Sequence, residues 1–525
     1  MTRYSLPLFV RIMPVGLSRQ SISRQLIGLP LFTCFALFIA VAGCQSTQED
    51  PLIMEGRLLA QHYCSNCHQT PSPELLDKDT WVKHVLPAMA TNLGLEVYPE
   101  GLYYAGSKSA ISFDDWQKLT AYYQTLAPVK LKPASKPTPA IDNWGIFTVE
   151  KPRLDTTRTA MTTLVKMDTI GHQLYTSDAF RSDLTRWNSA LQPTRFRQLN
   201  SAVVNADFFR DKEGKERGTF TTLGTMRAAD IARGELVSLN LDGNQQADSS
   251  TLAVDLPRPL QSVPVDVNKD GRMDWVVCGF GHLKGGLYWL KQEANDKFTK
   301  QTIRDTPGAI QTITGDFNAD GWPDLMVLFA HADEGIWLFL NNKKGGFTER
   351  NLLRFPSVYG STSFQLVDFN KDGKLDIIYT CGDNSDYSKI LKPYHGLYIY
   401  LNQDDLQYKQ AYFYPINGCT KAVATDFDQD GDLDIATIAF FADFRHNPSE
   451  GCLLFEQKES LQFQPHAMPV STLGRWICMD VADVDQDGDQ DVVLGNFSKT
   501  FIIQEKITPS WNMHLPLVVL KNKTR

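Results

Sequence analysis

The chain has 525 residues, of which 42% are hydrophobic and 21% charged, and its formal net charge is −8. This length is too great for one ordinary domain, so the sequence predicts at least two. The acidic balance, without a basic or aromatic-rich stretch, excludes the class of nucleic-acid-binding proteins.

An apolar run near the N-terminus predicts a secretory signal. Leu26 to Ala42 is rich in Leu, Phe, Ile and Ala, and four arginines but no acidic residue precede it. The run ends in Val41-Ala42-Gly43-Cys44, which resembles the lipobox of bacterial lipoproteins. The resemblance implies a signal peptide over residues 1–43, lipidation of Cys44 and a short tether over residues 44–50. The protein would then be lipid-anchored in the bacterial cell envelope, facing the periplasm or the cell surface. A transmembrane anchor is the alternative, but the run is short for a membrane span.

The segment Cys64-Ser65-Asn66-Cys67-His68 carries the attachment signature of a c-type haem. We expect one covalent haem c, joined to the two thiols through its vinyl groups, with His68 as an iron ligand. A thioredoxin-like thiol pair and half of a zinc site are the alternatives. Neither is favoured, because no second Cys-x-x-Cys follows the motif.

Two helices are predicted around this motif. One covers Gly56 to Tyr63 and leads into Cys64, and the other covers Phe113 to Leu126, with Ser112 at its start and Pro128 after its end. The apolar residues at helical spacing in the second helix are Trp116, Leu119, Tyr122, Tyr123 and Leu126. This arrangement resembles a small class I cytochrome c, which implies an all-α haem domain over residues 51–128.

A distal iron ligand is expected between these helices, in the segment from Trp81 to Leu93. Met89 is favoured, because a thioether after a proline-bounded turn suits a Met/His cytochrome. His84 would instead give a bis-histidine site of lower potential, and an open or external position is the remaining alternative. Met89 could also be ordinary core filling. His62 is expected on the helix surface.

A change of composition marks the second domain. Residues 129–142 contain Pro133, Pro137 and Pro139 with little apolar content, so they predict a semi-rigid linker. Residues 143–525 alternate strand-like runs with turn residues and show little helical periodicity. This pattern predicts an all-β domain.

Five acidic loops repeat through the all-β segment at spacings of 50, 52, 58 and 57 residues, a period typical of propeller blades. Each loop has Asp or Asn at positions 1, 3, 5 and 9 and Gly at position 6, which is the first half of an EF-hand arrangement and predicts Ca²⁺ binding. The predicted side-chain ligands are Asp266, Asn268, Asp270, Asp274, Asp316, Asn318, Asp320, Asp324, Asp368, Asn370, Asp372, Asp376, Asp426, Asp428, Asp430, Asp434, Asp483, Asp485, Asp487 and Asp491. The residues at position 7, which supplies a backbone carbonyl in an EF-hand, are Arg272, Trp322, Lys374, Asp432 and Asp489.

The number of these loops distinguishes metal sites from simple turns. One such loop could be a hairpin turn, because Asp, Asn and Gly are turn residues. Five loops with the same offsets, each leading into a hydrophobic run, favour up to five Ca²⁺ sites. Removal of residues 1–43 would change the net charge from −8 to −12. Five Ca²⁺ ions would then bring it to about −2.

The loops look like those of FG-GAP or VCBS-type repeats, the calcium-loop blades of integrin-like β-propellers, over residues 155–525. The resemblance implies a seven-bladed β-propeller whose two earlier blades, beginning at Thr162 and Ala202, have lost the acids. In the second of these blades the offsets from Asp207 place Phe209 and Lys215 at ligand positions, so no metal is expected there. Residues 146–150 have the pattern of a fourth strand that the last blade lacks. They are predicted to close the ring beside residues 517–520.

Cys34 would be removed with the signal peptide, Cys44 would carry the lipid, and Cys64 and Cys67 would carry the haem. Five cysteines then remain in the propeller. An odd number of cysteines in an exported domain prevents complete pairing into disulfides, and the apolar strand contexts favour buried thiols. A single disulfide is the alternative. These cysteines are Cys278, Cys381, Cys419, Cys452 and Cys478.

The favoured function is electron transfer by a membrane-anchored monohaem cytochrome, whose propeller binds a redox partner protein or a small-molecule ligand. The first alternative is an oxidoreductase in which the propeller oxidises a substrate and the haem accepts the electrons. Adhesion with a structural or sensory haem is the second. Candidate residues for the enzyme, which surface-loop polarity explains more simply, follow second strands and are His282, His331, Asp333, Glu334, Asp383 and His446. The tryptophan-docking repeats of seven-bladed quinoprotein dehydrogenases are absent from the sequence. No Ser-His-Asp elbow, phosphate loop or zinc-protease motif is visible either, so catalysis is not favoured.

Overall fold

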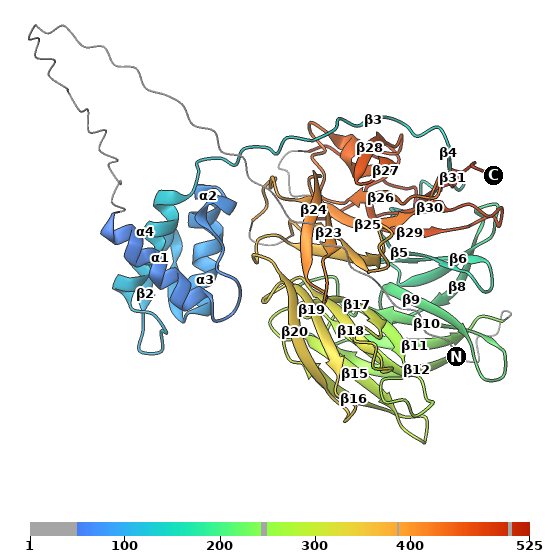
Figure 1. The fold of residues 1–525 in the computed structure, drawn as a ribbon, viewed down its shortest axis with the longest axis horizontal. Helices are drawn as coiled ribbons and strands as arrows, with labels where there is room; N and C mark the ends of the chain where they lie inside the picture. The colour runs from blue at the N-terminus through green and yellow to red at the C-terminus, as the bar shows by residue number, and fades with distance from the viewer. Residues whose placement is uncertain (1–49, 243–248, 386–387, 502–506) are drawn as a thin grey trace, which may run out of the picture. The chain divides into compact units, whose positions relative to one another are not determined.

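The structure is a computed structural model that describes residues 50–525 except 243–248, 386–387 and 502–506 (Figure 1). The predicted signal peptide and the lipidation site at Cys44 therefore lie outside the described residues. Among the helices that are described, none is both long and apolar enough to cross a membrane.

The first described segment is mainly helical. Its elements are α1 (Pro51–Cys64), η1 (Pro73–Leu75), α2 (Lys78–Thr80), the π-helical turn η2 (Trp81–Val85), α3 (Leu86–Asn92), β1 (Leu95–Tyr98), η3 (Pro99–Gly101), β2 (Leu102–Ala105) and α4 (Phe113–Leu126). The predicted helix over residues 113–126 is confirmed, and Ser112 Oγ caps it by accepting a hydrogen bond from Asp115 N at 3.1 Å. The first helix begins earlier than predicted, because Asp50 accepts from Leu52 N at 2.9 Å and Pro51 suits the first helical position.

Close packing of α1 against α4 forms the core of this segment. A Cβ atom on Gly56 of α1 would lie 2.3 Å from the Lys118 carbonyl oxygen of α4, so only glycine allows this approach of the two helices. The α4 residues that are buried are Trp116, Leu119, Tyr122 and Tyr123, whereas Leu126 is exposed.

The expectation of an all-α segment is wrong in one respect. Strands β1 and β2 form an antiparallel hairpin in which Leu95 faces Ala105 and Tyr98 faces Leu102. The turn between them contains Pro99 and Gly101, which favour a reversal of the chain. A hairpin this short gives little alternation in the sequence, and the prediction missed it.

Residues 143–525 fold as a seven-bladed β-propeller, as predicted (Figure 1). Blades 1 and 2 consist of β5 (Thr162–Asp168), β6 (Gln173–Asp178), β7 (Asp183–Trp187) and β8 (Pro193–Gln198), then β9 (Val203–Arg210), β10 (Glu216–Thr222), β11 (Gly234–Asn240) and β12 (Ser249–Leu256). Blades 3 and 4 consist of β13 (Pro259–Val265), β14 (Asp274–Gly279), β15 (Gly286–Gln292) and β16 (Phe298–Arg304), then β17 (Ala309–Gly315), β18 (Asp324–Phe329), β19 (Gly335–Asn341) and β20 (Phe347–Arg354).

The remaining blades follow the same order. Blade 5 consists of β21 (Ser361–Val367), β22 (Asp376–Cys381), β23 (Gly396–Asn402) and β24 (Tyr408–Pro415). Blade 6 consists of β25 (Cys419–Thr425), β26 (Asp434–Ala439), β27 (Cys452–Glu459), preceded by η4 (Pro448–Gly451), and β28 (Gln462–Ala467). Blade 7 begins with β29 (Trp476–Ala482), β30 (Asp491–Asn496) and β31 (Leu517–Asn522).

Strand β4 (Phe147–Glu150) completes blade 7 and thereby closes the ring, which confirms the predicted closure (Figure 1). It pairs antiparallel with β31, with Glu150 opposite Val519 and Phe147 opposite Asn522. Phe147 is buried, and its ring lies 5.5 Å from that of Phe427 in the neighbouring blade.

Ile141 and Asp142, the last two residues of the predicted linker, also join a sheet of the propeller. Strand β3 (Ile141–Asp142) runs parallel to β28 as an extra edge strand of blade 6. The ring therefore receives two short strands from the segment that precedes blade 1.

The second strand of each acidic-loop blade lies in the interior. All six residues of β14, β18, β22, β26 and β30 are buried, because neighbouring blades cover both faces of these strands. The propeller cysteines are free thiols, four of them buried and Cys478 partly buried. No disulfide joins them, as the buried-thiol prediction expected.

The closing strand gives a direct test of ring stability. A propeller that starts at residue 143 retains β4, whereas one that starts at residue 151 lacks it and exposes the edge of β31. We expect the second protein to melt at a lower temperature and to aggregate more readily, because an unpaired edge strand pairs with other chains. Thermal unfolding and size-exclusion chromatography measure both effects. Equal melting and solubility of the two proteins would contradict closure by β4.

Candidate functional site

The Cys-x-x-Cys-His motif forms a tight turn directly after helix α1. The helix ends at Cys64, and the backbone N–H groups of Cys67 and His68 both donate to the Cys64 carbonyl oxygen at 3.4 Å. The turn therefore holds the two thiols and the imidazole in one short segment. Cys64 is partly buried and Cys67 is exposed.

The hydrogen bond of His68 leaves one ring nitrogen available for a metal. His68 Nδ1 lies 3.0 Å from the carbonyl oxygen of Gln69. A carbonyl oxygen only accepts, so Nδ1 donates, and in the neutral ring Nε2 then keeps its lone pair. A fixed tautomer of this kind is typical of metal-ligating histidines.

Cys64 and Met89 pack against one apolar cluster, most of whose residues belong to the helical segment. Both side chains are half-buried and pack against the core that contains Trp116. Burial, with a smaller contribution from Cys67, raises the pKa of the Cys64 thiol to about 11. His84 is exposed and does not belong to the cluster. Met89 thus shares the surroundings of the motif, although it lies on helix α3 rather than after the turn that was expected.

A buried donor without a partner lies in the same cluster. The indole N–H of Trp116 has no hydrogen-bond acceptor among the described residues, although its ring is 1% exposed and packs 5.3 Å from Tyr103. Unpaired buried donors are uncommon and costly. A bound group with acceptor oxygens would satisfy this one, and a haem carries two propionates. Cys64, Cys67, His68 and this donor are the residues that would hold a haem, and His62 is exposed on α1.

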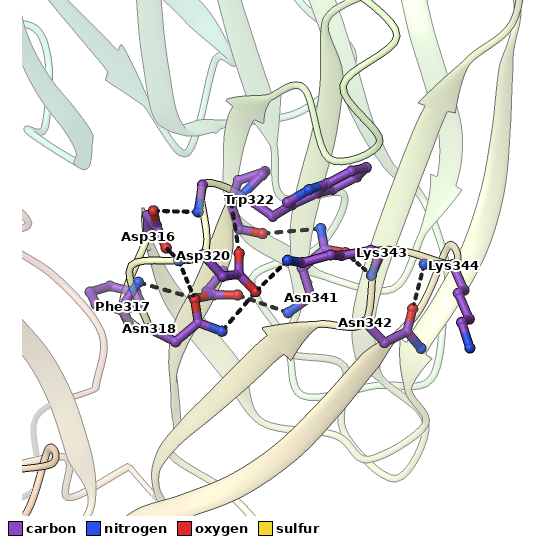
Figure 2. Close-up of polar contacts among 12 residues, drawn as sticks. Asp316, Phe317, Asn318, Asp320, Trp322, Asn341, Asn342, Lys343 and Lys344 are labelled. Carbon is purple, nitrogen blue, oxygen red and sulfur yellow. Dashed lines mark hydrogen bonds and ion pairs between the residues drawn. The ribbon is translucent and has the colours of Figure 1, made fainter.

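The acidic loops have one common geometry, which Figure 2 shows for blade 4. Asp316, at position 1, accepts from the backbone N–H groups of Asp320 and Gly321 at 3.0 and 2.8 Å. Asn318, at position 3, accepts from Asp320 N at 3.0 Å and donates through Nδ2 to the Asp320 carboxylate at 3.0 Å. The side chains at positions 1, 3 and 5 therefore converge inside the turn.

The aspartate at position 9 is buried and connects the loop with the third strand. Asp324 accepts from Phe317 N at 3.0 Å and from Asn341 N, at the end of β19, at 2.8 Å. The corresponding third-strand donors are Gln292 N, Asn402 N, Gln457 N and Asn522 N, which donate to Asp274, Asp376, Asp434 and Asp491 at 2.7 to 2.9 Å. This residue therefore has a structural role that the sequence prediction, which treated it only as a ligand, missed.

An asparagine at the end of the third strand links neighbouring blades. Asn341 Nδ2 donates to the carbonyl oxygen of Val267 in blade 3 at 2.9 Å, and Asn522 Nδ2 donates to Phe427 in blade 6 at 2.8 Å. The sequence signal for these residues is the Asn that ends three of the third strands.

The loops of blades 6 and 7 have the strongest potential for a cation. Two groups of carboxylates each approach within 4.8 Å, namely Asp426, Asp428 and Asp434, and Asp483, Asp485 and Asp491. Four buried carboxylate oxygens in these loops have no hydrogen-bond partner among the described residues: Oδ1 of Asp426, Asp432, Asp485 and Asp489. Burial, together with neighbouring aspartates, raises the pKa values of Asp434 and Asp491 to about 7. A divalent cation would relieve this repulsion.

The loops of blades 3, 4 and 5 are partly neutralised by the protein itself. Asparagine at position 3 replaces one carboxylate, and the position 5 carboxylate has a basic neighbour in each loop. These ion pairs are Arg272 with Asp270 at 2.5 Å, Lys343 with Asp320 at 3.3 Å and Lys374 with Asp372 at 3.8 Å. The five loops therefore form two classes, which already differ in sequence at position 3. In blade 7 a lysine also contacts the loop, because Lys521 pairs with Asp485.

The polar residues after the second strands lie on loops between second and third strands, and two histidines of this set lie near each other. The rings of His282 and His331 are 6.4 Å apart and nearly parallel. Burial, with His282 nearby, lowers the pKa of His331. The structure therefore brings these two histidines together, from blades 3 and 4.

The other residues of this set are held by local contacts. Asp333 pairs with Arg304 at 2.9 Å and with Arg354 at 2.8 Å. Glu334 is fully buried, accepts from Ser361 N and Oγ at 2.6 Å, and has its pKa raised by burial to about 8. Asp383 accepts a hydrogen bond from Ser385 N at 2.8 Å, and His446 Nδ1 lies 3.0 Å from the Asp443 carboxylate. These contacts hold the loops locally.

Comparison with known proteins agrees with the repeat pattern. Residues 266–327 and 316–379 match the FG-GAP-like repeat, so the chain contains FG-GAP-like repeats. No match was found among curated protein sequences.

Similar solved structures include an ancestral GH74 enzyme, AFV00434, at 11% identity and a TM-score of 0.45, with 69% of this chain and 48% of that chain covered. BBS1N, from its complex with ARL6DN, is 11% identical at a TM-score of 0.43 and covers 72% of this chain and 97% of its own. Virginiamycin B lyase from Staphylococcus aureus is 10% identical at a TM-score of 0.43, with 71% of this chain and 98% of that chain covered. Likeness at this level gives no indication of function. The chain spans about half the length of the GH74 enzyme.

The two loop classes predict different calcium affinities, and position 3 is the simplest residue to exchange. We expect Asp428→Asn to weaken Ca²⁺ binding at the blade 6 loop roughly tenfold, because affinity depends on the number of ligand charges. Asn268→Asp should strengthen binding in blade 3 for the same reason. Competition with a fluorescent chelator measures both. The exposed Asp405→Asn provides the control, and unchanged affinity in both loop variants would contradict the assignment.

The link between blades predicts a cost for losing Asn341. We expect Asn341→Ala to lower the free energy of unfolding by about 1–3 kcal/mol, because the buried Val267 carbonyl loses its hydrogen bond. The neighbouring Asn342→Ala is the control, since Asn342 is exposed and bonds only within its own turn. Chemical denaturation at saturating Ca²⁺ measures the difference. An equal loss in the two variants would mean that the link between blades does not stabilise the propeller.

Proposed function

We propose that the chain is an extracytoplasmic, lipid-anchored c-type cytochrome in which a haem segment is joined to a calcium-binding β-propeller. Its role is electron transfer, with the propeller binding a redox partner protein or a small ligand. The observation that carries this proposal is the geometry at the end of α1, where two cysteines and a histidine with an available Nε2 lie in one turn.

Three features support haem rather than a thiol redox pair. The tautomer of His68 suits metal ligation, whereas a thioredoxin-like pair needs no such histidine. The raised pKa of Cys64 disfavours a reactive thiolate, because catalytic cysteines have lowered values. The unpaired Trp116 donor and the half-buried Met89 belong to the same cluster as Cys64. When bound, the haem would supply one-electron redox chemistry.

The chain's own residues would have distinct tasks around the haem. Cys64 and Cys67 would hold it covalently, and His68 would coordinate the iron on one side. Met89 is the proposed distal ligand, because it is half-buried and packs against the same core as Cys64, whereas His84 is exposed. The apolar core between α1 and α4 would keep water away from the site.

Calcium is proposed to stabilise the propeller rather than to take part in electron transfer. The unpaired carboxylate oxygens in the loops of blades 6 and 7 support this role. Bound ions would add stability through mass action. Membrane anchoring is proposed from the lipobox resemblance at Cys44. Retention of a Cys44→Ala variant in the membrane fraction would contradict that anchor.

A second candidate function is an oxidoreductase, and the stacking of His282 with His331 is the observation that favours it. Two adjacent imidazoles on one face of the propeller could move a proton from a bound substrate. Substrate-dependent reduction of the haem, lost in a His331→Ala variant, distinguishes this enzyme from an electron carrier.

The haem assignment is tested by extraction and by ligand exchange. We expect the purified protein to keep its colour through acid–acetone extraction, because thioether bonds hold the haem. Met89→Ala should change the absorption spectrum through loss of the distal ligand, whereas His84→Ala should leave it unchanged. Complete loss of colour on extraction would contradict the covalent haem. A spectrum altered by His84→Ala and not by Met89→Ala would reverse the assignment of the ligand.

A further inference from the structure

Blades 1 and 2 have a cavity where the other blades carry acidic loops. Strand β5 ends at Asp168 and β6 begins at Gln173, whereas in blade 3 β13 ends at Val265 and β14 begins at Asp274. The shorter turn in blade 1 leaves a cavity of about 360 Å³ between the two blades. Polar side chains line most of it: Asp168, Gln173, Tyr175, Arg186, Glu216 and Asp242. This volume is at the lower end of the range for small-molecule sites.

Two carboxylate oxygens face the same point in this cavity. A Cβ atom on Gly171 would lie 2.7 Å from Asp168 Oδ2 and 2.9 Å from Glu216 Oε2, so glycine keeps this point open. The other oxygens are already occupied. Asp168 Oδ1 accepts from Ile170 N and Gly171 N at 2.9 and 3.1 Å, and Glu216 Oε1 pairs with Arg210 at 2.7 Å. Within the described part of the chain, neither Asp168 Oδ2 nor Glu216 Oε2 has a hydrogen bond or an ion pair.

The charge of the cavity indicates the sign of the missing partner. Its lining carries three carboxylates and one guanidinium, a net charge of −2. The guanidinium of Arg186 stacks on the ring of Phe196, with Cζ 5.4 Å from the centroid, and forms no ion pair with Asp168. Asp168 is 1% exposed, and a buried charge needs a counter-charge. The net negative lining therefore favours a cationic ligand over an anionic or a neutral one.

The small number of converging carboxylates favours an organic cation over a metal ion. Among the described residues, Asp168, Glu216 and Asp242 do not form a group of three carboxylates with oxygens within 4.8 Å of one another, whereas Ca²⁺ takes about six to eight oxygen ligands. A primary ammonium directs three N–H donors outward and can reach acceptors that are farther apart.

We propose that the cavity between blades 1 and 2 binds the primary ammonium group of a small polar ligand. Asp168 Oδ2 and Glu216 Oε2 accept two of its N–H groups, and the space above Gly171 receives the nitrogen. Gln173 and Arg186 then contact polar atoms in the rest of the ligand. This site is independent of the proposed haem, and its test does not require the haem.

Paired ligands test the charge requirement directly. Calorimetry on the full-length protein in Ca²⁺ buffer compares glucosamine with glucose and putrescine with 1,4-butanediol. We expect saturable one-to-one binding of at least one amine, and at least tenfold weaker binding of its hydroxyl analogue. Equal binding of both members of each pair, or no saturable binding of either amine, would overturn the proposal.

Variants locate the site. Gly171→Ala places a methyl group where the nitrogen is proposed, and Glu216→Gln removes one charge while keeping the shape of the side chain. We expect at least tenfold weaker amine binding in each, with unchanged melting temperature. Gly145→Ala is the matched control, because a Cβ there meets no atom within 4 Å. Unchanged binding in Glu216→Gln would overturn the proposal even if Gly171→Ala failed to fold. Loss of one bound Ca²⁺ in Glu216→Gln would also overturn it, in favour of a metal site.

Discussion

The buried aspartate at position 9 of each acidic loop is the interaction on which the propeller repeats depend. All five of these aspartates accept a backbone N–H from the end of the third strand, and Asp324, Asp376, Asp434 and Asp491 also accept one from their own loop. Hydrogen bonds to a charged acceptor contribute about 1.5–3 kcal/mol each. The loop geometry, the register of the third strand and the position of the linking asparagine all follow from this carboxylate. Calcium would add to an arrangement that the backbone already holds.

The architecture of the propeller was predictable because its signal repeats. Aspartates with fixed offsets, each followed by an apolar run, indicated five blades, and the strand patterns that begin at Thr162 and Ala202 indicated two more. Residues 146–150 indicated the closing strand. The helix over residues 113–126 was also predictable, since Ser112 and the spacing of Trp116 and Leu119 are local features. The hairpin at residues 95–105 was not, because four-residue strands leave too short a pattern.

The parts of the sites that the sequence did not reveal are those formed between distant segments. Lys343 neutralises Asp320 from the turn after β19, so the aspartate loop alone gives no sign of this ion pair. Glu216 meets Asp168 across two blades, and neither residue belongs to a motif. The two blades that had lost their acidic loops appeared in the sequence only as departures from the pattern. In three dimensions the shortened turn of blade 1 leaves a space that the acidic loop occupies in each of the later blades.

The closing pair of strands has a kinetic consequence. Thr148 and Lys521, which are hydrogen-bonded across β4 and β31, are 373 positions apart in the chain. Contacts of such sequence separation carry a large loop-closure entropy and form late and slowly in folding. The helical segment, whose contacts are local, can fold long before the ring closes. Throughout that interval the unpaired edges of blade 7 are exposed, so the vulnerable species is the nearly complete propeller, and the rate of this last pairing determines how long aggregation and proteolysis can compete with it.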